Sequence, residues 1–361
     1  MSVHWLYELA HSGTTIGKLT FAVVMVVLFL AVIGLLLFVI DRAPKTGRER
    51  IQAFLFLLPA VLLLAIGLIG PIIRTLISSL TSEEVDKQGC VPIPSPAACI
   101  ADPGGKWNNF AHFRWALTDH DALQALWHTL LWTLIAPTAA TLIGLAYAYA
   151  IDKMRGETLA KSLIFLPFAI SFVGAAVIWN LMYKQPSENA ASGLVNVVLN
   201  WFGLGPLNFP TTGGVRLTLL MIVVMIWIQV GFATVILSAA IKSVPNELSE
   251  AAKIDGATAG QAFRRVVVPT IRPTIIVVVV LISVATLKVF DLIRTFGADQ
   301  YNGDTLANLM YTQFRTSGIS AGAGSPLGEH RSSALAMEIF VLLIPFIVYQ
   351  VRQGIKARGI R

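Results

Sequence analysis

The chain has 361 residues, of which 55% are hydrophobic and 13% are charged, and its mean hydropathy is +0.72. A soluble protein carries about 25% charged residues, so this composition excludes a soluble domain and indicates an integral membrane protein. The net charge of +7 does not indicate nucleic-acid binding, because the basic residues lie in short loops beside apolar segments, where they orient a membrane protein.

The sequence lacks the motifs of an enzyme. Its nearest approach to a P-loop, at residues 13–19, has the wrong glycine spacing and no Ser or Thr after Lys18. Its histidines form no HExxH pair, and no nucleophile elbow is present. We therefore predict no catalytic residue, no metal site and no cofactor bound by this chain.

Seven segments are apolar and long enough to cross the hydrocarbon core of a bilayer, which is about 30 Å thick and takes roughly 20 helical residues. The segments are predicted near residues 19–40, 52–78, 125–150, 162–183, 217–241, 274–293 and 333–351. The first is too long for a signal peptide and lacks a small-residue cleavage site after Ile40, so we expect it to be retained. If the first segment instead lay in the membrane interface, six spans would remain and the amino terminus would be inside.

Basic residues distinguish the two sides of the membrane. They cluster after the first, third, fifth and seventh segments, and these loops all lie on one side if the segments alternate in direction. By the positive-inside rule, that side is the cytoplasm. The prediction is a multi-pass protein of the cytoplasmic (inner) membrane, with its carboxyl terminus in the cytoplasm and its amino terminus outside.

The outer loop 81–122 contains both cysteines, Cys90 and Cys99. The outer compartment permits oxidation, so we expect a disulfide, which would stabilise the local fold by about 2.5 to 3 kcal/mol on the chain-entropy model. Two free thiols are the alternative. The aromatic residues that follow are interpreted as an interface belt and a small local core rather than a ligand platform: Trp107, Phe110, Phe113 and Trp115.

The other two outer connections are residues 184–215 and 295–331. The first contains an apolar piece, 194–202, that is too short to span a membrane and is interpreted as an interfacial or lid-like helix. The second contains a glycine-rich run at 318–328. Both face the side from which a substrate would arrive.

A polar stretch, residues 245–273, separates the fifth and sixth apolar segments. Asn246 is placed to cap a short helix, and an Asp-Gly pair ending at Gly256 supplies a turn, because glycine tolerates positive φ. Thr258 is placed to cap a second helix that Pro269 would end. The sequence therefore predicts two short helices that meet at an angle.

This stretch resembles the cytoplasmic loop of the membrane subunits of binding-protein-dependent ABC importers. The signature of that loop is Glu-Ala-Ala, three residues, Gly, then nine residues and a hydrophobic-x-x-Pro ending, which here is Val266 to Pro269. In that family the loop is a coupling helix in a cleft of a separate ATPase subunit, so small alanines would enter a groove and carboxylates would meet basic side chains. The alternative is a solvated connector. By resemblance, the coupling residues are Glu250, Ala251, Ala252, Asp255, Gly256 and Ala257.

The resemblance extends from about Phe54 to the carboxyl terminus, where the order of spans is similar to that of the maltose-type sugar permeases. Residues 162–183, 227–257 and 287–311 look most like the alpha-glucoside branch. The implied fold is an all-α polytopic permease with about seven transmembrane helices and a cytoplasmic coupling helix. The implied parts are an amino-terminal tail, first helix and basic loop (1–51) and a transmembrane domain (52–361) with the coupling loop at 242–273.

Similar positions of the maltose-type permeases line the sugar cavity, which by resemblance falls on Trp227, Gln229, Phe232 and Thr286. A sugar ring offers an apolar face to aromatic side chains, while its hydroxyls need amide or hydroxyl partners. In the alternative, the amide and the hydroxyl bond neighbouring helices. Lys288 and Asp291 are three residues apart and are predicted to form a structural or gating pair on one helical face.

The predicted function is the permease subunit of an ATP-driven importer that carries a sugar, of the alpha-glucoside or a related oligosaccharide class. The implied partners are a second homologous permease, two ATPase subunits with ATP and magnesium, an extracytoplasmic sugar-binding protein and membrane lipid. Closure of the ATPases would move the coupling loop and switch the spans between inward-open and outward-open states. The alternative is an ion-coupled secondary transporter, which would need no docking loop and would more often show inverted repeats, absent from this sequence.

Overall fold

The computed structural model describes residues 57–58, 60–82, 106–152, 154–184, 193–204, 213–297, 302–317 and 326–358, with the isolated positions 20, 23, 27 and 34. The chain divides into a first unit, Met1–Arg74, and a second unit, Thr75–Arg361. The end of the first unit is helical and includes a π-helical turn, η1 (Ala65–Ile69), whose side chains are exposed. The following helix, α4 (Gly70–Leu80), begins in the first unit and ends in the second.

The second unit is all-α in its described residues, as predicted, apart from a two-residue antiparallel ladder between β1 (Thr81–Ser82) and β2 (Lys106–Trp107). The three longest helices are α6 (His120–Ile151), α10 (Gly214–Lys242) and α17 (Pro326–Arg358). The shorter elements are α5 (Ala111–Ala116), α7 (Glu157–Phe165), η2 (Leu166–Ala169), α8 (Phe172–Met182), α9 (Leu194–Trp201), α11 (Asn246–Ile254), α12 (Ala259–Ala262), η3 (Phe263–Val267), α13 (Val268–Thr270), α14 (Arg272–Leu287), α15 (Asp291–Phe296) and α16 (Leu306–Ser317).

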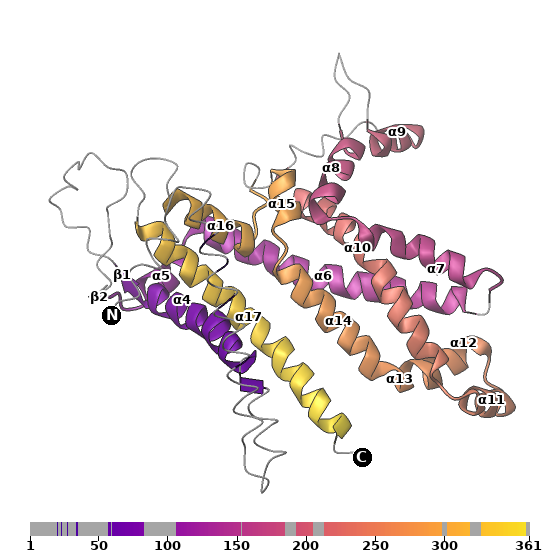
Figure 1. The fold of residues 1–361 in the computed structure, drawn as a ribbon. Helices are drawn as coiled ribbons and strands as arrows, with labels where there is room; N and C mark the ends of the chain where they lie inside the picture. The colour runs from indigo at the N-terminus through magenta and orange to yellow at the C-terminus, as the bar shows by residue number, and fades with distance from the viewer. Residues whose placement is uncertain are drawn as a thin grey trace, which may run out of the picture. The chain divides into compact units, whose positions relative to one another are not determined.

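Helices α6 and α10 pack along each other at the centre of the second unit, and α14 packs against both (Figure 1). Asp119 caps α6, because its carboxylate accepts the backbone N–H groups of Asp121 and Ala122 at 3.2 and 3.4 Å. The two long helices approach closely at Gly144, where an added Cβ would lie 2.6 Å from the Cβ of Ala233. Small residues at this crossing allow the backbones to approach, which is typical of helix packing in membranes.

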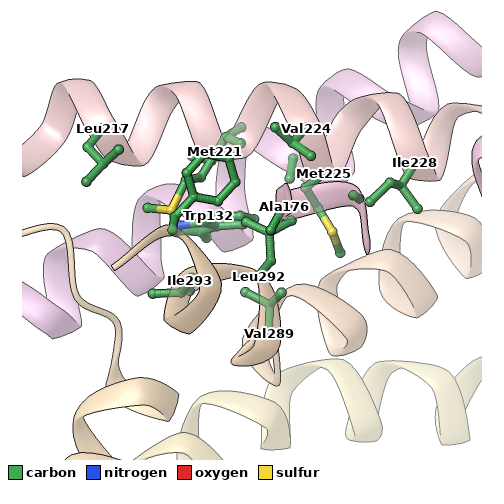
Figure 2. Close-up of a cluster of buried hydrophobic side chains, with 14 of the residues drawn as sticks. Trp132, Ala176, Leu217, Met221, Val224, Met225, Ile228, Val289, Leu292 and Ile293 are labelled. Atoms are coloured by element: carbon green, nitrogen blue, oxygen red, sulfur yellow. The ribbon is translucent and has the colours of Figure 1, made fainter. Parts of the chain in front are cut away.

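One buried cluster joins α6, α8, α10 and α15 at the end of the bundle away from α11 (Figure 1). Figure 2 shows Trp132 of α6 beside Met221 of α10, with Leu292 and Ile293 of α15 on the other side. All four side chains are fully buried. Because the cluster contains residues from distant parts of the sequence, it holds the short helix α15 against the two central helices.

The span predicted at residues 162–183 is not one straight helix. It consists of α7 with η2 and then α8, and the two halves meet at 96°. Ile170 is extended (φ −82°, ψ 136°), and Ser171 caps α8 by accepting the N–H of Gly174 at 3.1 Å. The sequence did not predict this bend, because hydropathy measures how apolar a segment is and not its direction.

The second helix of the polar stretch also differs from its prediction. Pro269 does not end it, because α13 continues through Pro269 to Thr270, and the chain then turns by 69° at Ile271 into α14. The five residues before α13 form the π-helical turn η3. A wider turn at this point accommodates Pro269, which has no N–H group to donate to the preceding turn. The second helix of the polar stretch, Ala259–Thr270, and α14 therefore form one bent helical segment.

Four described helices are long and apolar enough to cross a membrane, and two bent pairs bring the number to as many as six. The four are Ala60–Leu80, His120–Ile151, Gly214–Lys242 and Gly328–Gln353, and the pairs are Glu157–Ala169 with Phe172–Met182 and Ala259–Thr270 with Arg272–Leu287. These six correspond to the second to seventh predicted segments. The first predicted segment lies almost entirely outside the described residues, as do Cys90 and Cys99, so their disulfide and the side of the amino terminus stay predictions.

Two histidine rings stack beside the β1–β2 ladder. The ring centroids of His112 (α5) and His330 (α17) lie 5.5 Å apart at an interplanar angle of 7°, and both side chains are buried. The Nδ1 atom of His330 lies 2.7 Å from the backbone oxygen of Ser78, and the guanidinium of Arg331 lies 4.4 Å from the ring centroid of Trp115. Burial lowers the pKa of His112 below its ordinary value of 6.5, and the neighbouring imidazole of His330 adds to the lowering. The stack therefore joins α5 to α17 most stably when His112 is neutral.

Candidate functional site

The polar stretch 245–273 forms the two short helices that its sequence predicts. α11 follows Pro245, and Asn246 is its first residue rather than its cap, a difference of one position. All nine residues of α11 are exposed or only partly buried. A helix that buries no face in its own chain has its surface available to another protein.

The surface of α11 is acidic and narrow. Glu250 and Asp255 are exposed, and the described residues include no ion-pair partner for either carboxylate. Ala251 is exposed and Ala252 is partly buried, so only methyl groups lie between Glu250 and Lys253. This arrangement allows close approach to a groove while the carboxylates remain available to basic side chains.

The turn after α11 depends on glycine for its backbone conformation. Gly256 has φ 82°, a region that a residue with a Cβ adopts only with strain, although no atom lies within 4 Å of the position of an added Cβ. Three backbone hydrogen bonds of 2.9 to 3.0 Å close the turn, including Ala257 N–H to Ala252 O at 2.9 Å. The predicted turn is confirmed, and it holds α11 and α12 in a fixed relation.

Thr258 forms the predicted cap of the second helix. Its hydroxyl accepts the Gln261 N–H at 3.3 Å, and the Gln261 side chain accepts the Thr258 N–H at 2.9 Å, which completes a capping box. One turn later, the Phe263 ring lies 4.2 Å from the ring of Tyr149 on α6. The polar stretch is thus exposed at α11 and packed against the bundle after α12.

Ile254 is a surface feature that the sequence analysis did not single out. It is the last residue of α11, and 86% of its side chain is exposed. Ile254 follows Glu250 by four residues, so the two side chains lie on the same face of the helix. The sequence could have indicated this feature, because Ile254 is an isoleucine in a helix that has no apolar stripe to bury it.

The two aromatic residues predicted to contact sugar both pack against the bent segment formed by α7, η2 and α8. Trp227 is partly buried, and its ring centroid lies 5.7 Å from that of Trp179 in an edge-to-face arrangement. Phe232 is partly buried and stacks on Phe168 of η2, with centroids 5.3 Å apart. Their role in sugar binding stays a prediction.

The two polar residues of that set, Gln229 and Thr286, are buried. The Thr286 hydroxyl donates to the backbone oxygen of Ser283, in its own helix, at 2.8 Å. The described part of the chain contains no hydrogen-bond partner for the Gln229 amide. Their role in sugar binding, and the alternative that they bond neighbouring helices, stay predictions.

Lys288 and Asp291 do not share a helical face, because α14 ends at Leu287 and α15 begins at Asp291. The prediction assumed a continuous helix, and the break between the two residues removes that geometry. Ion pairs in the described residues lie elsewhere, at Glu157. Lys288 instead lines a cavity of about 370 Å³ between α14, α16 and α17, with Leu287, Phe290, Ala307, Met310, Tyr311, Ala336 and Ile339.

Residues 123–361 match the protein family described as binding-protein-dependent transport system inner membrane component. The match covers more than half of the chain, and the chain belongs to this family. It is a multi-pass permease of the inner membrane.

Two relatives and one solved structure are similar to the chain. An alpha-glucoside transport system permease protein of Rhizobium meliloti is 34% identical over 310 residues, which are 86% of this chain and 84% of the relative. An osmoprotective compounds uptake permease protein of Synechocystis is 35% identical over 256 residues, 69% of this chain and 87% of the relative. A bacterial alginate ABC transporter, solved with an alginate-bound periplasmic protein, has the same fold with a TM-score of 0.64, at 22% identity over 84% of this chain and 94% of that one.

Proposed function

We propose that this chain is the permease subunit of an ATP-driven importer that carries a sugar, of the alpha-glucoside or a related oligosaccharide class, into the cell. It would act with a second homologous permease, two ATPase subunits that hold ATP and magnesium, and an outer sugar-binding protein. The observation that carries the proposal is the exposed helix α11, whose Glu250 carboxylate has no ion-pair partner among the described residues. The name of the Rhizobium meliloti relative supports the class of substrate.

The face of α11 that carries Glu250 and Ile254 defines what the ATPase must offer. Glu250 requires a basic side chain, and the 86% exposed side chain of Ile254 requires an apolar pocket one turn away. ATP chemistry takes place on the ATPase, and this chain receives only its movement. Closure of the two ATPases would displace α11 and so switch the spans between their inward-open and outward-open arrangements.

Sugar would pass along the side of α10 that carries Gln229. This residue is 4% exposed, and an amide can both donate to and accept from a sugar hydroxyl. Phe232 lies three positions further along, on the same face of α10, and its ring is large enough to cover the apolar face of a sugar ring. The proposed path therefore combines one hydrogen-bonding group with one aromatic surface on the same helix.

The test of ATPase docking uses Glu250→Lys and Gly256→Val, with Gly260→Ala as the matched control. Loss of one partner of a buried charge pair costs about 3 to 5 kcal/mol, and positive φ at a residue with a Cβ costs about 1 to 2 kcal/mol. Gly260 has open space around it and no positive φ, so its variant tests substitution in the loop without strain. We expect the first two variants to lose the co-purifying ATPase and sugar uptake, and the control to keep both. Full uptake and normal ATPase binding in both variants would make the loop a solvated connector.

The substrate class is tested by the ATPase activity of the reconstituted complex with its binding protein. We expect stimulation by alpha-glucosides such as maltose, trehalose and sucrose. Stimulation by an osmoprotectant such as glycine betaine, with no response to these sugars, would contradict the sugar proposal and follow the Synechocystis relative instead. Uptake driven by an ion gradient without ATP would favour the ion-coupled alternative.

A further inference from the structure

The cytoplasmic ends of α7 and α10 are joined by a carboxylate that meets two lysines. Glu157 is in the first turn of α7, where it forms an ion pair with Lys161 in the same helix and a second with Lys242, the last residue of α10. The Lys242 Nζ lies 2.6 Å from Glu157 Oε1 and 2.8 Å from Oε2. The side chain of Glu157 is 20% exposed and that of Lys242 is 49% exposed. We refer to the contact between Glu157 and Lys242 as the α7–α10 bridge.

Both charges suit the helix ends on which they stand. An acidic residue is favoured in the first turn of a helix and a basic residue in the last turn, because of the partial charges of the unpaired backbone groups. Gly156 begins α7 with φ 90°, so the chain turns sharply just before Glu157. The bridge therefore links two helix ends that are fixed by their own backbone, rather than two mobile side chains on a smooth surface.

The bridge lies next to the entry of the coupling loop. Only Ser243, Val244 and Pro245 separate Lys242 from α11. Backbone N–H groups of this connection bond to the last turn of α10, with Ser243 to Ala239 O at 3.1 Å and Val244 to Ile241 O at 3.2 Å. A hydrogen-bonded connection of three residues has little conformational freedom. A displacement of α11 therefore moves the end of α10 and with it Lys242.

We propose that the α7–α10 bridge is a positioning pair that passes the movement of the coupling helix to α7. Glu157 and Lys242 would keep the end of α10 and the start of α7 together while α11 is displaced. The bent segment α7–η2–α8 carries Phe168 and Trp179, the ring partners of Phe232 and Trp227, so movement of α7 reaches the predicted sugar contacts. This inference rests on the proposed function, because it requires that an ATPase moves α11.

The test compares Glu157→Gln and Lys242→Gln with the matched control Lys161→Gln in the complete complex, reconstituted with ATPase and binding protein. Lys161→Gln removes the other partner of Glu157 but leaves the bridge to α10 intact. The measured quantity is the number of ATP molecules hydrolysed for each sugar imported. We expect this ratio to rise about 2- to 30-fold in the two bridge variants, the range over which residues between coupled sites change coupling. The control and the amount of bound ATPase should stay unchanged.

The double variant Glu157→Lys/Lys242→Glu separates positioning from simple loss of a charge. It places a glutamate on α10 opposite lysines at positions 157 and 161, so the link between the helices is restored with its charges exchanged. We expect the ratio of ATP to sugar to return to within about twofold of the wild-type value, less than the change expected from losing the coupling. An unchanged ratio in both bridge variants, or no rescue by the exchange, would overturn the inference. If the bridge variants couple normally while Glu250→Lys sheds the ATPase, only this inference fails and the proposed function stands.

Discussion

Gly231 on α10 offers the sharpest test of how tightly the bundle is packed. A Cβ added at this position would lie 2.3 Å from the backbone oxygen of Ile164 and 2.7 Å from the Cα of Phe165, both in α7. The shorter distance is about 1 Å inside the range of ordinary contact, and the obstacle is backbone, which cannot rotate away as a side chain can. Gly231→Ala must therefore push α7 and α10 apart.

Overpacking of this kind typically costs about 1 to 3 kcal/mol, which corresponds to a fall of about 2 to 12 °C in the thermal midpoint of a domain of this size. The assay is thermal unfolding of the purified complex at one scan rate, because membrane complexes often unfold irreversibly. The control is Gly260→Ala, the same chemical change at an exposed position where nothing lies within 4 Å. Equal midpoints for the two variants would refute the close approach of α7 and α10.

Two further predictions concern the proposed substrate path and the histidine stack between α5 and α17. Trp227→Ala and Gln229→Ala should each raise the KM for sugar uptake without loss of expression. For Gln229→Ala, the lost hydrogen bond predicts an increase in KM of about 2- to 12-fold. Unchanged uptake kinetics in both variants would move the sugar contacts to other residues or to the partner permease. Because burial lowers the pKa of His112 in the folded protein, the unfolded chain takes up this proton first as pH falls below about 6.5, so the stability contributed by His112 is lost toward acid. The thermal midpoint should be measured about one pH unit above and one pH unit below that value. The fall in midpoint from the higher to the lower pH should be larger in the wild type than in His112→Phe, and equal falls would show that His112 does not titrate in this range.

The sequence predicted the spans well and their directions poorly. Four described helices and two bent pairs lie close to the second to seventh predicted segments, because an apolar run of about 20 residues has few alternatives in a chain of this composition. The bend at Ser171 was missed because the signals there are a single extended residue and one capping hydroxyl. Such local features do not change the hydropathy of the segment, so the apolar composition conceals them.

The candidate site shows the same division between local and distant interactions. The turn at Gly256 and the capping box at Thr258 were predictable because each depends on residues within a few positions. The exposure of Ile254, the packing of Phe263 on Tyr149 and the bridge between Glu157 and Lys242 were not. Two of these are contacts across more than 80 positions in the chain, and the third is the absence of a neighbour, so neither local propensity nor spacing records them.

Under the proposed function, two connections would pass movement from the exposed loop to α7 and α14. On the entry side, Lys242 joins the end of α10 to α7 through Glu157. On the exit side, Ile271 is buried at the 69° turn, and its N–H bonds to Val267 O while its own oxygen accepts the N–H of Ile275, both at 3.0 Å. The turn is therefore hydrogen-bonded on both sides and does not behave as a free hinge. Movement applied to α11 would reach α7 by an ion pair and α14 by continuous backbone, which places the predicted contacts on α10 and α14 between two moving segments.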